Sequence, residues 1–186
     1  TLACSVEVAQ QAGLLMQNDT PATGRMVDAH LTLKSPADTP MAPAVDFGYT
    51  YLSGDDPDSM NEYEGWHPVF SEYPIWREEL LPLKLWGVWT NLHQYRAQAK
   101  MALAENVSLT TAYAFLLPDE EDTAPSAISG GADGGDNFGH LISAFIDINV
   151  TKNMSVALEG AQLYMGDYWA DDVATEWLRI QTVLKF

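Results

Sequence analysis

Apolar and polar residues alternate one by one along eight segments of this 186-residue chain, and this pattern restricts the chain to β-structure. The clearest segment is "LHQYRAQAKMAL" (92–103), in which every second residue from Gln94 to Lys100 is polar. Successive side chains of a strand point to opposite faces of the sheet, so each segment has a polar and an apolar face. We therefore predict eight strands, at residues 3–15, 25–34, 44–54, 90–103, 107–117, 139–150, 154–166 and 174–186.

The predicted strands are joined by connections of two kinds. Residues 104–106 and 151–153 are tight turns and residues 35–43 are of moderate length, whereas residues 55–89, 118–138 and 167–173 are long, acidic or rich in Gly or Pro. If the strands run up and down in order, the short connections fall on one rim of the sheet and the long ones on the other. Transmembrane β-barrels have this asymmetry, although a soluble sandwich with so few connections can acquire it by chance.

The net charge of −17 argues against nucleic acid as a partner, because an acidic protein repels the phosphate backbone. Three segments, 55–79, 119–136 and 167–172, hold 17 of the 26 acidic residues. The acidity therefore belongs to the connections and not to the strands. Apolar stretches are too short for a membrane helix, but a transmembrane β-strand needs only about 9–11 alternating residues.

Aromatic residues gather near the ends of the predicted strands that meet the long connections. They are Tyr49, Tyr51, Trp86, Trp89, Tyr164, Tyr168, Trp169 and Trp177. Girdles of Trp and Tyr occur at membrane interfaces, although a soluble barrel can also carry aromatic residues at its rim. The sequence favours an all-β fold, an antiparallel up-and-down transmembrane β-barrel, in which residues 1–186 form a single β-barrel region.

If the apolar face meets lipid, the polar face lines the interior. The candidates to line a water-filled pore are Lys34, Gln94, Arg96, Gln98, Lys100, Arg179 and Lys185. The same face carries the acids Glu7, Asp28, Asp46, Asp147 and Glu159. Charges in a barrel lumen tune selectivity. Alternatively, they form ion pairs that fill a closed eight-stranded barrel with a structural or adhesive role, and a soluble ligand-binding β-barrel is a third interpretation.

The chain contains no recognisable catalytic motif. It lacks a Gly-x-Ser-x-Gly elbow, a phosphate-binding loop and a His-Glu-x-x-His pair, and its single cysteine, Cys4, cannot form a disulfide within the chain. We expect no catalytic residue, no cofactor and no metal ligand, and therefore a protein that is not an enzyme. The segment "SGDDPD" (53–58) offers carboxylates of the kind that bind Ca²⁺, but solvated loop charge is the simpler interpretation.

Three segments resemble a known family: "VDFGYTYLSGDDPD" (45–58), "WHPVFSEYPIW" (66–76) and "WTNLHQYRAQAKM" (89–101) are similar to the C-terminal region of alginate-export-type outer-membrane β-barrel proteins. The shared pattern is a strand that ends in Tyr-x-Tyr-x-Ser-Gly-Asp, a long acidic and aromatic connection, and a strand that opens on Asn-Leu-His. The resemblance implies that the chain is the C-terminal half of a barrel of about 16–18 strands.

The resemblance also implies a function and partners. It implies a channel, or porin, in the outer membrane of a Gram-negative bacterium, for passive export or diffusion of polar solutes that include anionic polysaccharides. The last segment, "LRIQTVLKF", ends on Phe186, which resembles the terminal aromatic signal that the barrel-assembly machinery reads. Outer-membrane lipid, that machinery and a polysaccharide or small polar solute are the expected partners.

Overall fold

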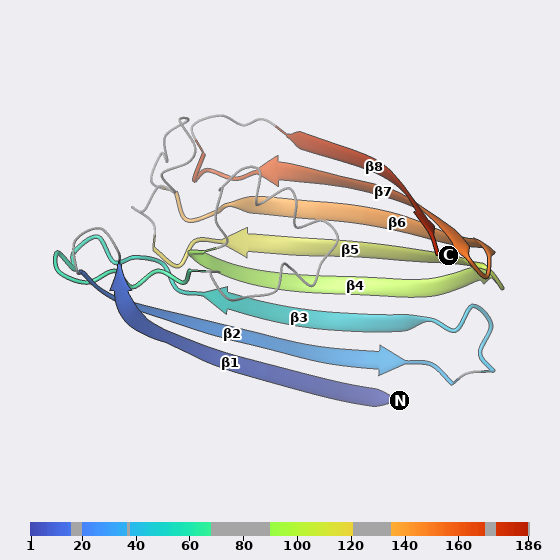
Figure 1. Ribbon diagram of the computed structural model, residues 1–186, viewed down its shortest axis with the longest axis horizontal. Helices are drawn as coiled ribbons and strands as arrows, with labels where there is room; N and C mark the ends of the chain where they lie inside the picture. Colours follow the sequence, from blue (N-terminus) through green and yellow to red (C-terminus); the bar gives the residue numbers. More distant parts are fainter. Residues whose placement is uncertain (16–19, 37, 68–89, 121–134, 170–173, 186) are drawn as a thin grey trace.

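The protein folds into one antiparallel sheet of eight strands (Figure 1). The computed structural model describes residues 1–15, 20–36, 38–67, 90–120, 135–169 and 174–185. The strands are β1 (Leu2–Leu15), β2 (Thr20–Lys34), β3 (Ala44–Leu52), β4 (Leu92–Ala104), β5 (Val107–Leu117), β6 (Gly139–Thr151), β7 (Met154–Met165) and β8 (Thr175–Leu184). They follow one another in chain order, which confirms the predicted all-β, up-and-down arrangement. Within the described residues, no helix is long and apolar enough to cross a membrane.

The connections are sorted between two rims as predicted, with one exception. Residues 105–106, 152–153 and 35–43 lie at the short-turn rim, and the long connections leave the sheet at the opposite, long-loop rim (Figure 1). The exception is β2, which begins at Thr20 and not at the predicted residue 25. Only residues 16–19 therefore separate β1 from β2 at the long-loop rim.

The early start of β2 was hidden by Pro21 and Gly24, residue types that are rare inside sheets. This part of β2 pairs with β1 but lies beyond the end of β3. In place of β3, residues of the β3–β4 connection lie beside this part of β2. The Tyr63 N–H donates to the Pro21 carbonyl (2.8 Å), and the Thr23 N–H donates to the Tyr63 carbonyl (2.7 Å).

The two faces of the sheet differ as a membrane barrel requires. The outer face carries exposed apolar side chains, namely Leu31, Leu33, Phe47, Tyr95, Tyr113, Ile142, Leu158, Tyr164, Leu178 and Ile180. The inner face carries the residues that alternate with them, and its buried polar members include Thr50, Gln94, Arg96, Thr110, Ser143 and Glu159. A soluble barrel has the opposite arrangement, whereas a transmembrane barrel is apolar outside and polar inside. The alternation alone left this orientation open, and the structure turns the polar face inward.

Strands β1 and β8 are the two edges of the sheet, and among the described residues neither pairs with a second strand. An edge strand presents a row of unpaired N–H and C=O groups, and the membrane interior does not tolerate such a row. The open sheet is therefore consistent with part of a larger barrel, and it argues against a closed barrel of these eight strands.

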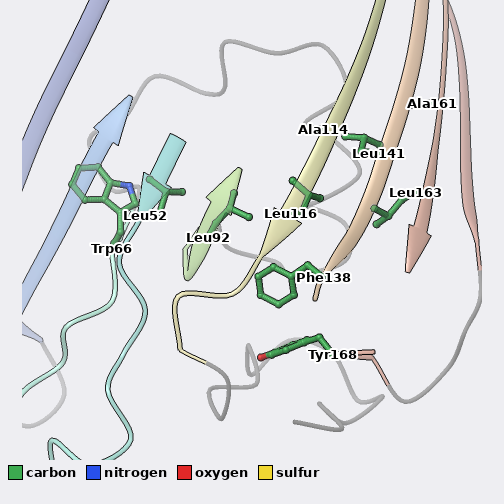
Figure 2. Packing of buried hydrophobic residues seen from close by; sticks show 10 residues of the cluster. All are labelled: Leu52, Trp66, Leu92, Ala114, Leu116, Phe138, Leu141, Ala161, Leu163 and Tyr168. Carbon is green, nitrogen blue, oxygen red and sulfur yellow. The ribbon is translucent and has the colours of Figure 1, made fainter. Parts of the chain in front are cut away.

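The long-loop end of the inner face is covered by aromatic side chains from the connections (Figure 2). Trp66 comes from the β3–β4 connection, Phe138 from the β5–β6 connection and Tyr168 from the β7–β8 connection, and all three are buried. They belong to one cluster with the strand residues Leu52, Leu92, Ala114, Leu116, Leu141, Ala161 and Leu163. We call these three rings the aromatic cap. The inner face is thus apolar and buried beneath the cap, and it becomes polar toward the short-turn rim.

Candidate functional site

A hollow of about 620 Å³ lies on the inner face of β1 to β4, on the short-turn side of the aromatic cap. Strand alternation brings Lys34, Arg96, Gln98 and Lys100 to its wall. Four of the seven residues that the sequence proposed as pore-lining therefore share one surface. Arg96 is 8% exposed, whereas Lys34 and Lys100 lie nearer the rim and are exposed.

Gln94, a fifth predicted residue, lies on the inner face between this hollow and the cap. It is opposite Thr50 on β3 and Leu116 on β5, and it is only 1% exposed. Within the described part of the chain, neither its Oε1 nor its Nε2 has a hydrogen-bond partner. A buried amide without partners is costly, and Gln94 does not line the hollow.

Arg179 and Lys185, the remaining two predicted residues, lie away from the hollow. The Arg179 Nε donates to the Glu159 Oε2 at 2.6 Å, and the guanidinium lies 5.1 Å from the Trp177 ring centroid. Arg179 is therefore an ion-paired inner-face residue. Lys185 follows the end of β8 and is exposed, and its N–H donates to the Asn153 carbonyl.

An acidic network on the same wall was only partly recognised from the sequence. The ring of His30 on β2 lies between two carboxylates, with its Nε2 3.1 Å from the Asp28 Oδ2 and its Nδ1 2.8 Å from the Asp46 Oδ1. Thr50 donates to the other Asp28 oxygen and Thr32 to the other Asp46 oxygen, each at 2.6 Å. Asp28 and Asp46 were predicted to face inward, but His30 was missed. Its position two residues after Asp28 placed it on the same face, whereas its contact with Asp46 depends on the register of β2 against β3.

The outer face carries a row of rings near the long-loop rim. Tyr49, Tyr95, Phe115, His140 and Tyr164 are successive cross-strand partners on β3 to β7. Two neighbouring pairs of rings are in contact, with centroids 5.1 Å apart for Tyr49 and Tyr95 and 4.8 Å apart for Phe115 and His140. A belt of this kind fits the membrane interface, where an aromatic body meets lipid and its polar tip meets water.

The predicted membership of this belt was partly wrong. Tyr168 is completely buried in the aromatic cap, and Trp177 lies on the inner face beneath Arg179. Trp169 is partly buried and donates from Nε1 to the Phe138 carbonyl at 2.9 Å. Trp86 and Trp89 lie outside the described residues, as does Phe186, so the proposed assembly signal remains a prediction.

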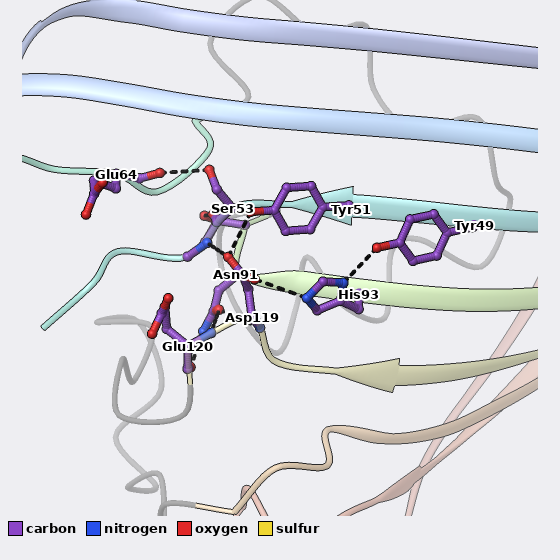
Figure 3. A network of polar contacts seen from close by, with 10 residues as sticks. Tyr49, Tyr51, Ser53, Glu64, Asn91, His93, Asp119 and Glu120 are labelled. Carbon is purple, nitrogen blue, oxygen red and sulfur yellow. Dashed lines mark hydrogen bonds and ion pairs between the residues drawn. The ribbon is translucent and has the colours of Figure 1, made fainter.

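Polar contacts at the strand ends hold the last residue of the β3–β4 connection against the first residues of the β5–β6 connection (Figure 3). The Asn91 side chain accepts hydrogen bonds from the N–H groups of Asp119 (2.9 Å) and Glu120 (2.7 Å). The Asp119 carboxylate bonds the His93 Nε2 (3.0 Å), and the other ring nitrogen of His93 bonds the Tyr49 hydroxyl (2.9 Å). The β3–β4 and β5–β6 connections are thereby tied to the outer belt.

Several acidic residues lie close to one another around the Asn91 contacts. Burial raises the pKa of Glu120, and the negative charges of Asp119, Asp56, Glu64 and Asp58 raise it further. The "SGDDPD" carboxylates are used within the loop itself, because Asp55 accepts the Glu64 N–H and Asp56 accepts the Asp58 N–H. In the part of the chain that the structure describes, no group of three or more His, Cys, Asp or Glu side chains is arranged to hold a metal ion.

An up-and-down antiparallel sheet with an apolar outer face, a polar inner face and an aromatic belt at one rim defines a transmembrane β-barrel protein of the outer membrane. The sequence model of the alginate export family matches residues 2–177, nearly the whole chain, so the protein belongs to the alginate export family. Membership confirms the resemblance and assigns the protein to the export channels of the Gram-negative outer membrane. A search of curated proteins found no match.

Proposed function

We propose that the inner wall of β1 to β4 guides polar, anionic polysaccharide chains through the channel by passive diffusion, without covalent chemistry. The observation that carries this proposal is the hollow in which Lys34, Arg96 and Lys100 converge with the amide of Gln98. Cations attract the carboxylates of such a chain, and amide and hydroxyl groups exchange hydrogen bonds with its sugar hydroxyls.

The composition of the wall favours transit over tight binding. Acidic groups, including Asp28 and Asp46, alternate with the basic ones around the hollow, so an anionic chain is not held strongly at any one point. Conduction requires a solute to bind well enough to enter and weakly enough to leave. Toward the long-loop rim, the aromatic cap narrows the passage along this inner wall, and there the solute leaves the polar surface.

Planar-bilayer recordings of the full-length protein test this proposal. We expect discrete conductance steps, and we expect Arg96→Gln combined with Lys100→Gln to shift the reversal potential in a salt gradient toward cation preference. The matched control is Lys152→Gln, which removes a positive charge from the 152–153 turn outside the hollow. A tight electrical seal from correctly folded protein, or equal shifts in both variants, contradicts the proposal.

A structural or adhesive role is the competing function, because the aromatic cap and the Arg179–Glu159 pair both fill the inner face. This role predicts an electrically silent barrel that is nevertheless inserted in the outer membrane. The Phe138→Ala variant helps to separate the two functions, since opening the cap increases an existing conductance but does not create one in a filled barrel.

A further inference from the structure

His30 is held on the inner face by acceptors on both sides. Its Nδ1 lies 2.8 Å from one Asp46 oxygen and its Nε2 lies 3.1 Å from one Asp28 oxygen. The other oxygen of each carboxylate accepts a threonine hydroxyl, so each group, when ionised, offers His30 only an acceptor. A neutral imidazole has one N–H and one lone pair, whereas the imidazolium has two N–H donors. Only the protonated ring therefore satisfies both contacts.

The sheet makes room for this ring at Gly48. Gly48 is the cross-strand neighbour of both His30 on β2 and Arg96 on β4. A Cβ at this position would lie 3.0 Å from the His30 Cε1 and 3.2 Å from its Nδ1. The missing side chain lets the imidazole lie across β3 toward Asp46, on the wall of the hollow. The side chains of His30, Asp28 and Asp46 are 18%, 13% and 17% exposed, so all three are accessible to solvent.

The charges around His30 are balanced without it. Facing the same hollow are three acids, from β1, β2 and β3, and three bases, from β2 and β4: Glu7, Asp28, Asp46, Lys34, Arg96 and Lys100. Their formal charges cancel. The wall is therefore neutral when His30 is neutral, and it carries one net positive charge when His30 is protonated.

We propose that His30 is the specificity-determining residue of this wall, and that its proton sets how strongly the wall prefers anions. The inference rests on the channel function proposed above. In this proposal, the three acids and three bases of the wall cancel one another, and the charge on His30 alone sets the preference for a polyanionic solute. Anion preference should then be greater at acidic pH and should decrease as the pH rises.

The test is the reversal potential of the full-length protein in a planar bilayer under a potassium chloride gradient, measured in steps from about pH 5 to about pH 8. In the wild type we expect the anion-to-cation permeability ratio to decrease by about twofold as the pH rises. This is roughly the effect on oppositely charged ions of one unit charge about 8 Å from the ion path, in water with salt screening over about 10 Å. His30→Gln should give a flat profile at the high-pH value. His140→Gln is the matched control and should keep the wild-type profile, because His140 bonds Tyr113 on the outer face.

Asp46→Asn is a second variant that does not depend on His30→Gln folding well. It removes one carboxylate from the balanced set, so anion preference should increase at every pH. A flat wild-type profile, a wild-type profile in His30→Gln, or unchanged selectivity in Asp46→Asn overturns the inference and leaves the channel in place. An absence of conductance in the wild type overturns the proposed function and this inference with it.

Discussion

The Arg179 guanidinium on β8 binds the carboxylate of Glu159 on β7, with Nε 2.6 Å from Oε2, and the Glu159 side chain has no solvent exposure. The two residues are directly opposite each other in the sheet. A buried carboxylate is tolerated only when it is paired and hydrogen-bonded. This contact therefore fastens the edge strand β8 to β7 from the inner face.

Replacing Arg179 by Met should destabilise the sheet, because it leaves the Glu159 charge buried without this cation. We expect the free energy of unfolding to decrease by about 3 kcal/mol, the lower end for a broken buried pair, since Arg179 is 35% exposed. Urea unfolding in lipid vesicles, followed by tryptophan fluorescence, measures this change. The double variant Glu159→Leu with Arg179→Met should recover most of the loss, and a double variant as unstable as the single one would contradict the pairing.

The strands were predictable from the sequence because period-two alternation is a local property of the chain. The predicted bounds of β5 are those of the structure, and those of β4 and β6 differ by only one or two residues. The start of β2 was missed because Pro21 and Gly24 oppose strand formation locally. Their pairing with β1 and Tyr63 compensates for that, and this is tertiary information.

Contacts between strands were harder to predict than the strands themselves. An alternating segment has two faces, but nothing in it says which face is inside, and the partner of each residue depends on the register. Asp46 was placed on the inner face without its contact with His30, and Glu159 and Arg179 were placed on that face without being placed in contact. The aromatic cap was missed because its rings lie in irregular connections, which have no periodicity to read.

Gly24 on β2 should be intolerant of a side chain. A Cβ there would lie 2.9 Å from the Gln11 Oε1, 3.0 Å from the Trp66 Cα and 3.1 Å from the Gly65 carbonyl oxygen. Because two of these atoms belong to the backbone, Gly24→Ala should push the described part of the β3–β4 connection off β2. We expect faster proteolysis within residues 53–67.

Gly13→Ala on β1 is the matched control, because nothing lies within 4 Å of a Cβ at that position. Alanine in place of a strand glycine reduces the entropy cost of folding, so the control should be neutral or slightly stabilising, by up to about 1 kcal/mol. Equal proteolysis of the two variants would show that the contacts of Gly24 with Gln11 and the 65–66 backbone are unimportant.

Phe138 should hold the aromatic cap closed over the inner face. The ring is 1% exposed, and it meets Tyr168 edge-on with centroids 4.4 Å apart. Phe138→Ala removes a large buried side chain, at a cost of about 3–5 kcal/mol in the free energy of unfolding. We also expect a larger single-channel conductance in planar bilayers, because losing the ring widens the passage at the long-loop rim. Phe47→Ala on the outer face is the control, and an equal conductance in both variants would show that the cap does not restrict flow.

The last prediction concerns pH and the contact between the β3–β4 and β5–β6 connections. Burial and neighbouring carboxylates raise the pKa of Glu120 above its usual value of 4.5. A carboxyl group whose pKa is raised by folding stabilises the folded state fully below its unfolded pKa, and this contribution is lost as the pH rises through the folded pKa. Hydrogen exchange of the Glu120 amide, which donates to Asn91, should therefore be slower at acidic than at neutral pH after correction for intrinsic rates. Glu120→Gln should keep the slow exchange at neutral pH, because the amide stays uncharged there. The control, Glu105→Gln in the exposed 105–106 turn, should not change the exchange rate. Faster exchange in Glu120→Gln at neutral pH would mean that ionised Glu120 stabilises the contact.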